Sequence, residues 1–214
     1  MPIAPLAYVP GQGGFSSIGK RTGELTGISA GDVLARFRWP LNVGKAVLLR
    51  IRAAIDVSSG LSNMVQMALQ GRKVTGFSAD FTTNLTSADL QSLPGTGLRS
   101  RIMGPSMMAN AGPGVATTAG MTGATLVKDT DPFVITPIGL FLPVSLAGAY
   151  VGNPVQPGAC SGLITLYEWA GNGDHPIVLS GNDGVLIESH FNGPGSGTFG
   201  LYTVWDWAEN VQGF

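Results

Sequence analysis

Alternation of apolar and polar residues is the clearest pattern in this chain of 214 residues. It runs through residues 32–39 (DVLARFRW), 46–56 (AVLLRIRAAID) and 198–207 (TFGLYTVWDW), where one set of alternate positions is mostly apolar. Successive side chains of a β-strand point to opposite faces of its sheet, so this period predicts strands that are buried on one side. A helix over 46–56 would instead mix Arg52 into its apolar stripe.

Glycine and proline separate the predicted strands, and the chain has 32 glycines and 14 prolines. The runs 58–63 (SSGLSN) and 180–183 (SGND) are typical of turns between antiparallel strands. The segments 104–125 and 132–158 are longer, and we expect long loops with short strands there. No segment has the pattern of a helix longer than two turns. The predicted fold class is therefore all-β: an antiparallel β-sandwich, jelly-roll-like, with long Gly/Pro-rich loops.

The strand pattern begins only near Asp32, which indicates how the chain is divided. Residues 1–31 are rich in Gly, Pro and Ser and have weak periodicity, so we expect an extended N-terminal arm. Residues 32–214 are expected to form a single jelly-roll-like domain. The alternation assigns four sets of residues to the inner faces of strands: Val33, Ala35, Phe37 and Trp39; Val47, Leu49, Ile51, Ala53 and Ile55; Leu163, Thr165, Tyr167 and Trp169; Phe199, Leu201, Thr203, Trp205 and Trp207.

Charged side chains make up only 12% of the chain, about half of their usual share in soluble domains. The 12 Lys and Arg residues are balanced by 13 Asp and Glu residues, which gives a formal net charge of −1. This balance argues against a nucleic-acid partner, which would need an excess of basic charge. The lack of a long apolar run argues against a membrane span. A surface so poor in charge predicts that other subunits cover part of it, and we expect a homo-oligomer.

Motifs for catalysis or cofactor binding are incomplete in this sequence. Residues 14–20 have the spacing of a phosphate-binding loop, but Arg21 stands where the Ser or Thr that binds magnesium is needed. His175 and His190 belong to no nucleophile motif, and we expect them to be exposed or in an interface. We therefore predict no catalytic residue, no cofactor and no enzymatic activity.

The remaining candidates for chemistry also favour structural roles. Glu168 and Glu188 are expected to face solvent on their strands, and nothing in the sequence brings them together as a glycosidase pair. Cys160 is the single cysteine, and we expect a small buried side chain there. Several loop residues carry oxygen atoms but lack the spacing of an EF-hand, so no metal site is predicted. These residues are Asp129, Asp131, Asn172, Asp174 and Asp183.

Arginine and tryptophan side chains are the candidates for partner binding. Arg36, Arg38, Arg50 and Arg52 occupy alternate positions of two successive strands, and on adjacent strands they would form one cluster of four cations. Such a cluster is either a solvated face or a site for an acidic partner. The four tryptophans fall mostly on the apolar phase of their strands, which favours core packing over the stacking of sugar rings.

Two parts of the chain resemble a known group of proteins. The run 173–209 (GDHPIVLSGNDGVLIESHFNGPGSGTFGLYTVWDWAE) resembles the ending of a group of tailed-bacteriophage virion proteins. Their final strand follows a Gly-containing turn and closes on a similar Trp-Ala-Glu triplet. The pair 34–40 (LARFRWP) and 44–55 (GKAVLLRIRAAI) is similar to their early part. Together the resemblance covers residues 34–70 and 159–209.

The proteins of this group have no catalytic or metal-binding motif that could be assigned to residues of this chain. The resemblance implies a non-enzymatic structural protein of a tailed-phage virion, and we expect a head decoration or cement protein that binds the outside of the capsid. The expected partners are the major capsid protein or other virion proteins, together with further copies of the chain in a homotrimer. The alternative is a receptor- or glycan-binding module of a tail or head fibre.

Overall fold

Strands form every regular element in the part of the chain that the computed structural model describes. The described residues are 15–39, 44–59, 67–82, 84–85, 113–138, 160–170, 175–194 and 196–209. Their strands are β1 (Phe15–Arg21), β2 (Val33–Arg38), β3 (Ala46–Ser59), β4 (Met67–Ala79), β5 (Asn84–Leu85), β6 (Gly114–Ala116), β7 (Thr125–Lys128), β8 (Val134–Ile138), β9 (Ile164–Glu168), β10 (Ile177–Leu179), β11 (Gly184–Ser189) and β12 (Thr198–Glu209). The predicted all-β class is confirmed.

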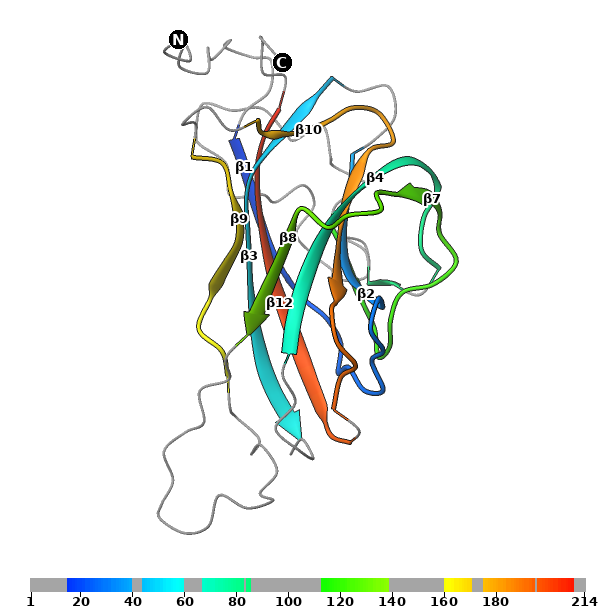
Figure 1. Cartoon of the computed structure of the whole chain (residues 1–214), viewed down its shortest axis with the longest axis vertical. Helices are drawn as coiled ribbons and strands as arrows, with labels where there is room; N and C mark the ends of the chain where they lie inside the picture. The colour runs from blue at the N-terminus through cyan, green and yellow to red at the C-terminus, as the bar shows by residue number, and fades with distance from the viewer. Residues whose placement is uncertain are drawn as a thin grey trace.

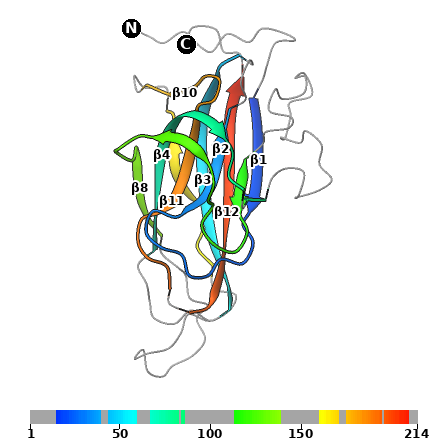
Figure 2. The same ribbon diagram turned by 90° about the vertical axis from the view of Figure 1, so that its right-hand side faces the viewer.

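The strands form two antiparallel sheets that pack against each other (Figure 1 and Figure 2). Sheet A has the order β1-β12-β3, and both β9 and β10 pair with the other side of β3. Sheet B has the order β5-β6-β2-β11-β4, and both β7 and β8 pair with the other side of β4. The molecule is therefore a β-sandwich, as the sequence predicts.

The order in which the chain visits the two sheets gives the sandwich a jelly-roll topology. Strands β1 to β4 alternate between sheet A and sheet B, and the chain returns through β11 in sheet B and β12 in sheet A. Strand β12 consequently lies between β1 and β3, and β11 lies between β2 and β4. This double winding is the arrangement found in jelly rolls.

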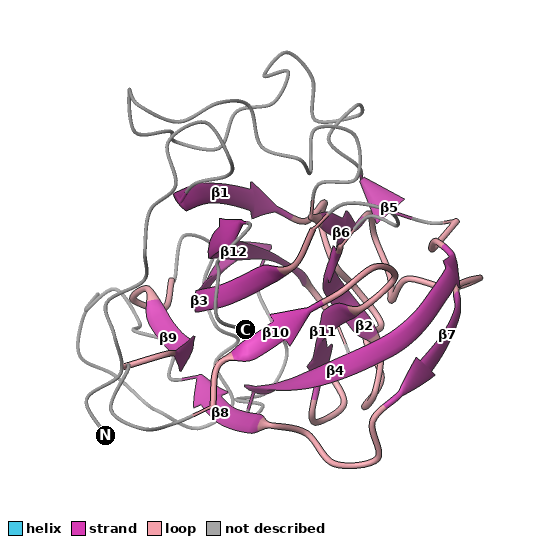
Figure 3. Ribbon diagram, turned by 90° about the horizontal axis from the view of Figure 1, so that it is seen from above, coloured by secondary structure: helices cyan, strands magenta, loops and turns pink. Residues whose placement is uncertain are grey.

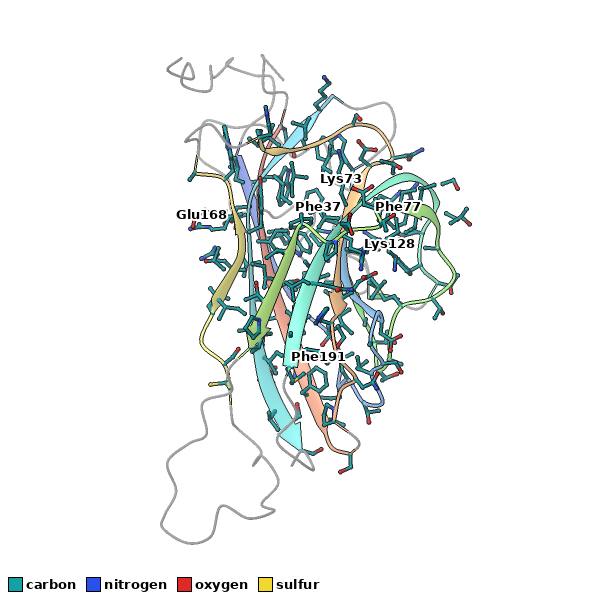
Figure 4. All side chains as sticks on the ribbon, in the orientation of Figure 1. Phe37, Lys73, Phe77, Lys128, Glu168 and Phe191 are labelled. Atoms are coloured by element: carbon teal, nitrogen blue, oxygen red, sulfur yellow. The ribbon has the colours of Figure 1, made fainter. Side chains whose placement is uncertain are left out.

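Aromatic side chains fill the space between the sheets. Phe37 of β2 packs against Trp205 and Trp207 of β12, with ring-centroid distances of 5.4 Å and 5.3 Å. Figure 4 shows Phe37 in the interior of the sandwich. Trp39 is also fully buried, and its Nε1 donates a hydrogen bond to the carbonyl of Gly44 at 2.6 Å. The interpretation of these three tryptophans as core residues is confirmed, so their rings are not available to stack on sugars.

Strand β3 contains a break in the alternation that the local sequence does not reveal. From Ile51 onward the predicted residues face the core, but before it Leu48 takes the place expected of Leu49. The pairing with β12 shifts here, because Asp206 lies opposite Arg50 and the next residue of β12 lies opposite Leu48. A β-bulge therefore turns two successive residues of β3 away from the core. Along β12 itself, all five residues predicted to face inward are buried.

In β9 the predicted inner face is right at Tyr167, which lies opposite Ile51 and packs against the core, but wrong at Leu163 and Thr165. Leu166 is the buried residue, at 4% exposure, whereas Leu163 is 51% exposed and Thr165 is exposed. This strand is short, and its pairing with β3 shifts by one residue between Ile51 and Arg52. The ring of Tyr167 lies 5.7 Å from that of Phe133, which precedes β8 in the other sheet. The two rings help to close the side between the sheets.

Residues 15–31 belong to the sandwich, which corrects the predicted extent of the N-terminal arm. Strand β1 pairs with β12 along its whole length, and Leu25 and Ile28 are buried members of the core. Strand β1 is an edge strand with few apolar residues and therefore shows no clear alternation. For this reason the sequence pattern did not predict a strand there. Residues 1–14 lie outside the described residues, as do the parts 104–112 and 139–158 of the predicted long loops.

The chain itself covers much of the outer face of sheet B. Arg36 is the neighbour of core-facing Phe37 and therefore points to this outer face, yet it is only 1% exposed. Its guanidinium packs over Gly114 of β6 and pairs with Asp80, which follows β4. Phe81, the next residue, packs against the hydrophobic core, with its ring 5.8 Å from that of Phe77. Figure 1 shows β7 and the adjoining segments on this side of the molecule.

Candidate interaction surface

The outer face of sheet A is more open to solvent, because Tyr202 in its middle is 44% exposed. Side chains that alternate with the core residues form three rows across this face. The rows are Ser17, Asp206, Arg50 and Glu168; Gly19, Val204, Arg52 and Thr165; Arg21, Tyr202 and Ala54. We call these residues the sheet A face. Figure 4 shows Glu168 projecting outward from β9 at its edge.

Asp206 joins two of the arginines that the sequence singled out. Arg50 Nε donates a hydrogen bond to Asp206 Oδ2 at 2.8 Å, and Arg52 Nη2 donates to the same oxygen at 3.3 Å. The hydroxyl of Ser17 donates to Oδ1. The hydrogen bond with Asp206 raises the pKa of Arg50. Glu168 is a weaker partner, since its carboxylate lies 3.9 Å from Arg50 Nη1 and its side chain is 57% exposed.

Arg21 forms a second cluster on the sheet A face. Its Nε and Nη2 donate to the carboxylate of Asp56 at 3.2 Å and 2.7 Å, and its Nη1 donates to the carbonyl of Thr22 at 3.1 Å. Nη2 also reaches Glu24 and Ser58. The hydrogen bond with Asp56 raises the pKa of Arg21, and a hydrogen bond with Ser58 lowers the pKa of Glu24. Every nitrogen of this guanidinium therefore has a partner within the chain.

The predicted cluster of four arginines does not form. Strands β2 and β3 belong to different sheets, so Arg36 and Arg38 lie on the outer side of sheet B while Arg50 and Arg52 lie on the sheet A face. The short connection between the two strands suggested a hairpin, but successive strands of a jelly roll change sheets. That Arg50 and Arg52 bind a partner stays a prediction.

Arg36 and Arg38 interact with residues of their own chain. Burial lowers the pKa of Arg36, and the neighbouring carboxylate of Asp80 opposes this effect. The guanidinium of Arg38 lies 5.2 Å from the centre of the Phe77 ring, a cation–π contact, and its Nη2 is 3.5 Å from Asn182 Oδ1. Because Arg36 is covered by the fold, it is not accessible to a partner in this structure.

Glu188 is buried at 1% exposure, although the sequence predicts that it faces solvent. Gln70 Nε2 and Arg72 Nε donate to one of its oxygens at 2.9 Å and 3.0 Å, and the ammonium of Lys128 pairs with the other. Arg72 Nη1 also donates to the carbonyls of the two residues after Lys128. Figure 4 shows Lys128 beside β4. These contacts, which we call the Glu188 cluster, fasten β7 and the following loop to β4 and β11.

The histidines and the cysteine show no catalytic arrangement among the described residues. His175 is exposed, as expected, and the half-buried His190 has its Nδ1 2.9 Å from Gln70 Oε1. Since the amide nitrogen of Gln70 donates to Glu188, its oxygen accepts from His190, whose Nδ1 therefore carries the proton. Cys160 is exposed, which corrects the expectation of a buried side chain.

Sequence reasoning missed the acidic members of the sheet A face. Asp206 stands between two buried tryptophans of β12. Because neighbouring side chains of a strand point to opposite faces, this position already indicates that Asp206 faces outward. Its pairing with Arg50 depends on the contact between β3 and β12, which are separated by most of the chain. Asp56 and Arg21 are likewise brought together only by the sheet.

Comparisons with known proteins give no relative for this chain. No protein-family model matches it, and neither a curated protein nor a solved structure does. Among the described residues, no group of His, Cys, Asp or Glu could hold a metal ion. Within the same residues, no helix is long and apolar enough to cross a membrane.

Proposed function

We propose that this protein is a non-enzymatic structural component of a tailed-phage particle, a decoration or cement protein on the outside of the head. The observation that carries the proposal is the asymmetry of the jelly roll. Arg36 and Glu188 of sheet B are buried by other parts of the chain, whereas the ring of Tyr202 is exposed on the sheet A face; Figure 3 shows β1, β12 and β3 side by side in sheet A. A sheet face that carries an exposed aromatic ring among half-buried polar side chains suits attachment to another protein surface.

The position of the sequence resemblance in the fold supports the same proposal. Residues 34–70 contain β2, β3 and the start of β4, and residues 159–209 contain β9 to β12. The two parts therefore supply the central pair of each sheet, β3 with β12 and β2 with β11. The resemblance to phage virion proteins thus falls on the strands that build the scaffold.

Attachment would depend on many modest contacts repeated by symmetry. The chain has a formal net charge of −1, so copies do not repel one another strongly. A homotrimer on the capsid would present three copies of the same face to the major capsid protein and its neighbours. Simultaneous contacts of linked subunits raise the overall affinity well above that of one subunit.

The copy number in purified particles tests this function. A decoration protein is expected at hundreds of copies per particle, and cryo-electron microscopy of particles made without it should show density missing from the outside of the head. Quantitative mass spectrometry of purified particles measures the copy number. A few tens of copies or fewer would favour a receptor- or glycan-binding module of a fibre instead. Complete absence from particles would contradict both functions.

A further inference from the structure

We propose that the outer edge of β1 pairs with β1 of a second copy of this chain, so that two sheets A join into one continuous antiparallel sheet. We call this the β1–β1 contact. The inference goes beyond the proposed function, because the contact needs no other virion protein. Among the described strands, β1 pairs only with β12 and is the last strand of sheet A on its side. Figure 3 shows it at the margin of the described strands, beyond β12.

The register identifies the backbone groups that face this outer edge. The Thr22 amide donates to the carbonyl of Leu201 at 2.9 Å, one position beyond the last pair of β1 with β12. Hydrogen-bonded and non-hydrogen-bonded pairs alternate along an antiparallel ladder, so the backbone groups of Ser17, Gly19 and Arg21 point away from β12. Gly19 is exposed, and because it has no side chain, its exposed atoms belong to the backbone.

The side chains beside the edge leave it accessible. The hydroxyl of Ser17 donates to Asp206 of β12, so this side chain leans toward the neighbouring strand. The guanidinium of Arg21 lies 5.6 Å from the centre of the Tyr202 ring, also on β12, and pairs with Asp56 of β3. Gly19, between the two, has no side chain. A further strand therefore meets no side chain of these residues in its path.

The other outer strands among the described residues are short, irregular or interrupted. Strands β5, β7 and β10 have two, four and three residues. The pairing of β9 with β3 shifts, and β8 contains Pro137, whose nitrogen cannot donate a hydrogen bond. Strand β1 has seven residues, no proline and an unshifted register with β12. Natural sheets protect their edges with such devices, so a regular edge without them is a site for strand addition.

The sequence of β1 favours a second β1 in antiparallel orientation as the added strand. With Gly19 of one copy opposite Gly19 of the other, Ser17 of each lies opposite Arg21 of the other, and every such pair exchanges two hydrogen bonds. The two cations of the strand, Lys20 and Arg21, then lie at opposite ends of the contact. Parallel pairing would instead place the same cations side by side, where like charges repel. The edge is thus complementary to itself under a two-fold rotation, as an isologous contact requires.

Sedimentation velocity of the purified full chain over a concentration series tests the β1–β1 contact. The wild type should form a species with about twice the mass of its smallest unit. If three copies form the proposed homotrimer, that unit is the trimer and the contact links two trimers. Gly19→Pro removes an N–H that faces away from β12, so it spares the ladder within the chain but blocks the contact, and it should stay at the smaller mass. Gly19→Ala keeps the N–H and is the matched control, which should associate like the wild type.

Hydrogen exchange of the wild type, followed by NMR, gives a second measurement that does not depend on the folding of a variant. The amides of Ser17, Gly19 and Arg21 should exchange rapidly in the smaller unit and slowly in the associated species. Slow exchange in the smaller unit would show that another segment of the same chain covers the edge, and it would overturn the inference. Circular dichroism checks that Gly19→Pro and Gly19→Ala are folded.

The remaining outcomes separate this contact from the proposed function. A wild-type mass that stays constant up to about 1 mM contradicts the contact, since a specific pairing should be detectable below that concentration. Association of Gly19→Pro at the same concentration as the wild type contradicts it equally. These experiments use no phage particle, whereas the copy number in purified particles tests the function. The contact can therefore fail while the function stands, and the function can fail while the contact stands.

Discussion

Replacement of Glu188 by alanine is expected to lower the free energy of unfolding by about 3 kcal/mol. The carboxylate is 1% exposed and is the common partner of Gln70, Arg72 and Lys128. Without it, two cations stay close together with no counter-charge, and the amide of Gln70 loses its acceptor. Lys128 is 38% exposed and can turn toward water, so the loss should fall at the lower end of the range for buried ion pairs.

Urea unfolding of the full chain, followed by tryptophan fluorescence, measures this loss. Glu168→Ala is the matched control, because that glutamate is also on a strand but is mostly exposed, and its effect should stay within about 0.5 kcal/mol. Glu188→Gln should lie between the two, since the amide fills the same space but leaves the cations unbalanced. A Glu188→Ala variant as stable as Glu168→Ala would show that the cluster does not hold β7 in place.

Replacement of Gly23 by alanine is expected to cost at least about 3 kcal/mol, or to prevent folding. A Cβ atom at this position would lie 1.9 Å from the carbonyl oxygen of Thr117 and 2.9 Å from its carbonyl carbon. The neighbouring backbone cannot move away easily, because the Gly23 amide donates to the carbonyl of Ala116 at 3.0 Å and Thr26 donates to Thr118 at 3.0 Å. The loss of stability is therefore steric, because the added Cβ would push the segment around Gly23 away from the segment around Thr117.

Gly19→Ala provides the comparison for this prediction. It lies in the same part of the chain, but its added Cβ would be 3.6 Å from Val204 Cγ2, an ordinary contact. We expect it to be neutral or slightly stabilising, because alanine has less freedom to lose on folding than glycine. Thermal unfolding of both variants, monitored by circular dichroism, measures the difference. Equal melting temperatures would mean that the segment around Thr117 does not pack on Gly23 as described.

Strands with strong alternation were predictable, and strands without it were not. The inner face of β12 was predicted at every position, because its buried residues stand at every second position from Phe199 to Trp207. In β3 the same rule fails at the bulge beside Arg50, since an inserted residue changes the phase without changing the residue types. Strand β1 was not predicted because it is an edge strand with few apolar residues, and its place in the fold comes from its pairing with β12.

The candidate surface was predictable only in part. Arg50 and Arg52 do face outward, as their alternation indicates, but Arg36 has the same local pattern and is buried. The difference is that a distant segment carrying Asp80 folds over Arg36. Glu188 is buried for the same reason, through Lys128 and the loop that follows it. A polar phase thus predicts the outward direction of a side chain but not whether another segment covers it.

The residue sequence by itself determined that this chain forms many strands separated by glycine and proline, and which side chains of its regular strands point inward. These properties depend on backbone geometry and on neighbours within a few residues. Only the tertiary structure decided that β2 and β3 lie in different sheets and that Asp206 meets Arg50 and Arg52. Such pairings join residues far apart in the chain, and many pairings of alternating strands satisfy the same local pattern until the whole core is packed.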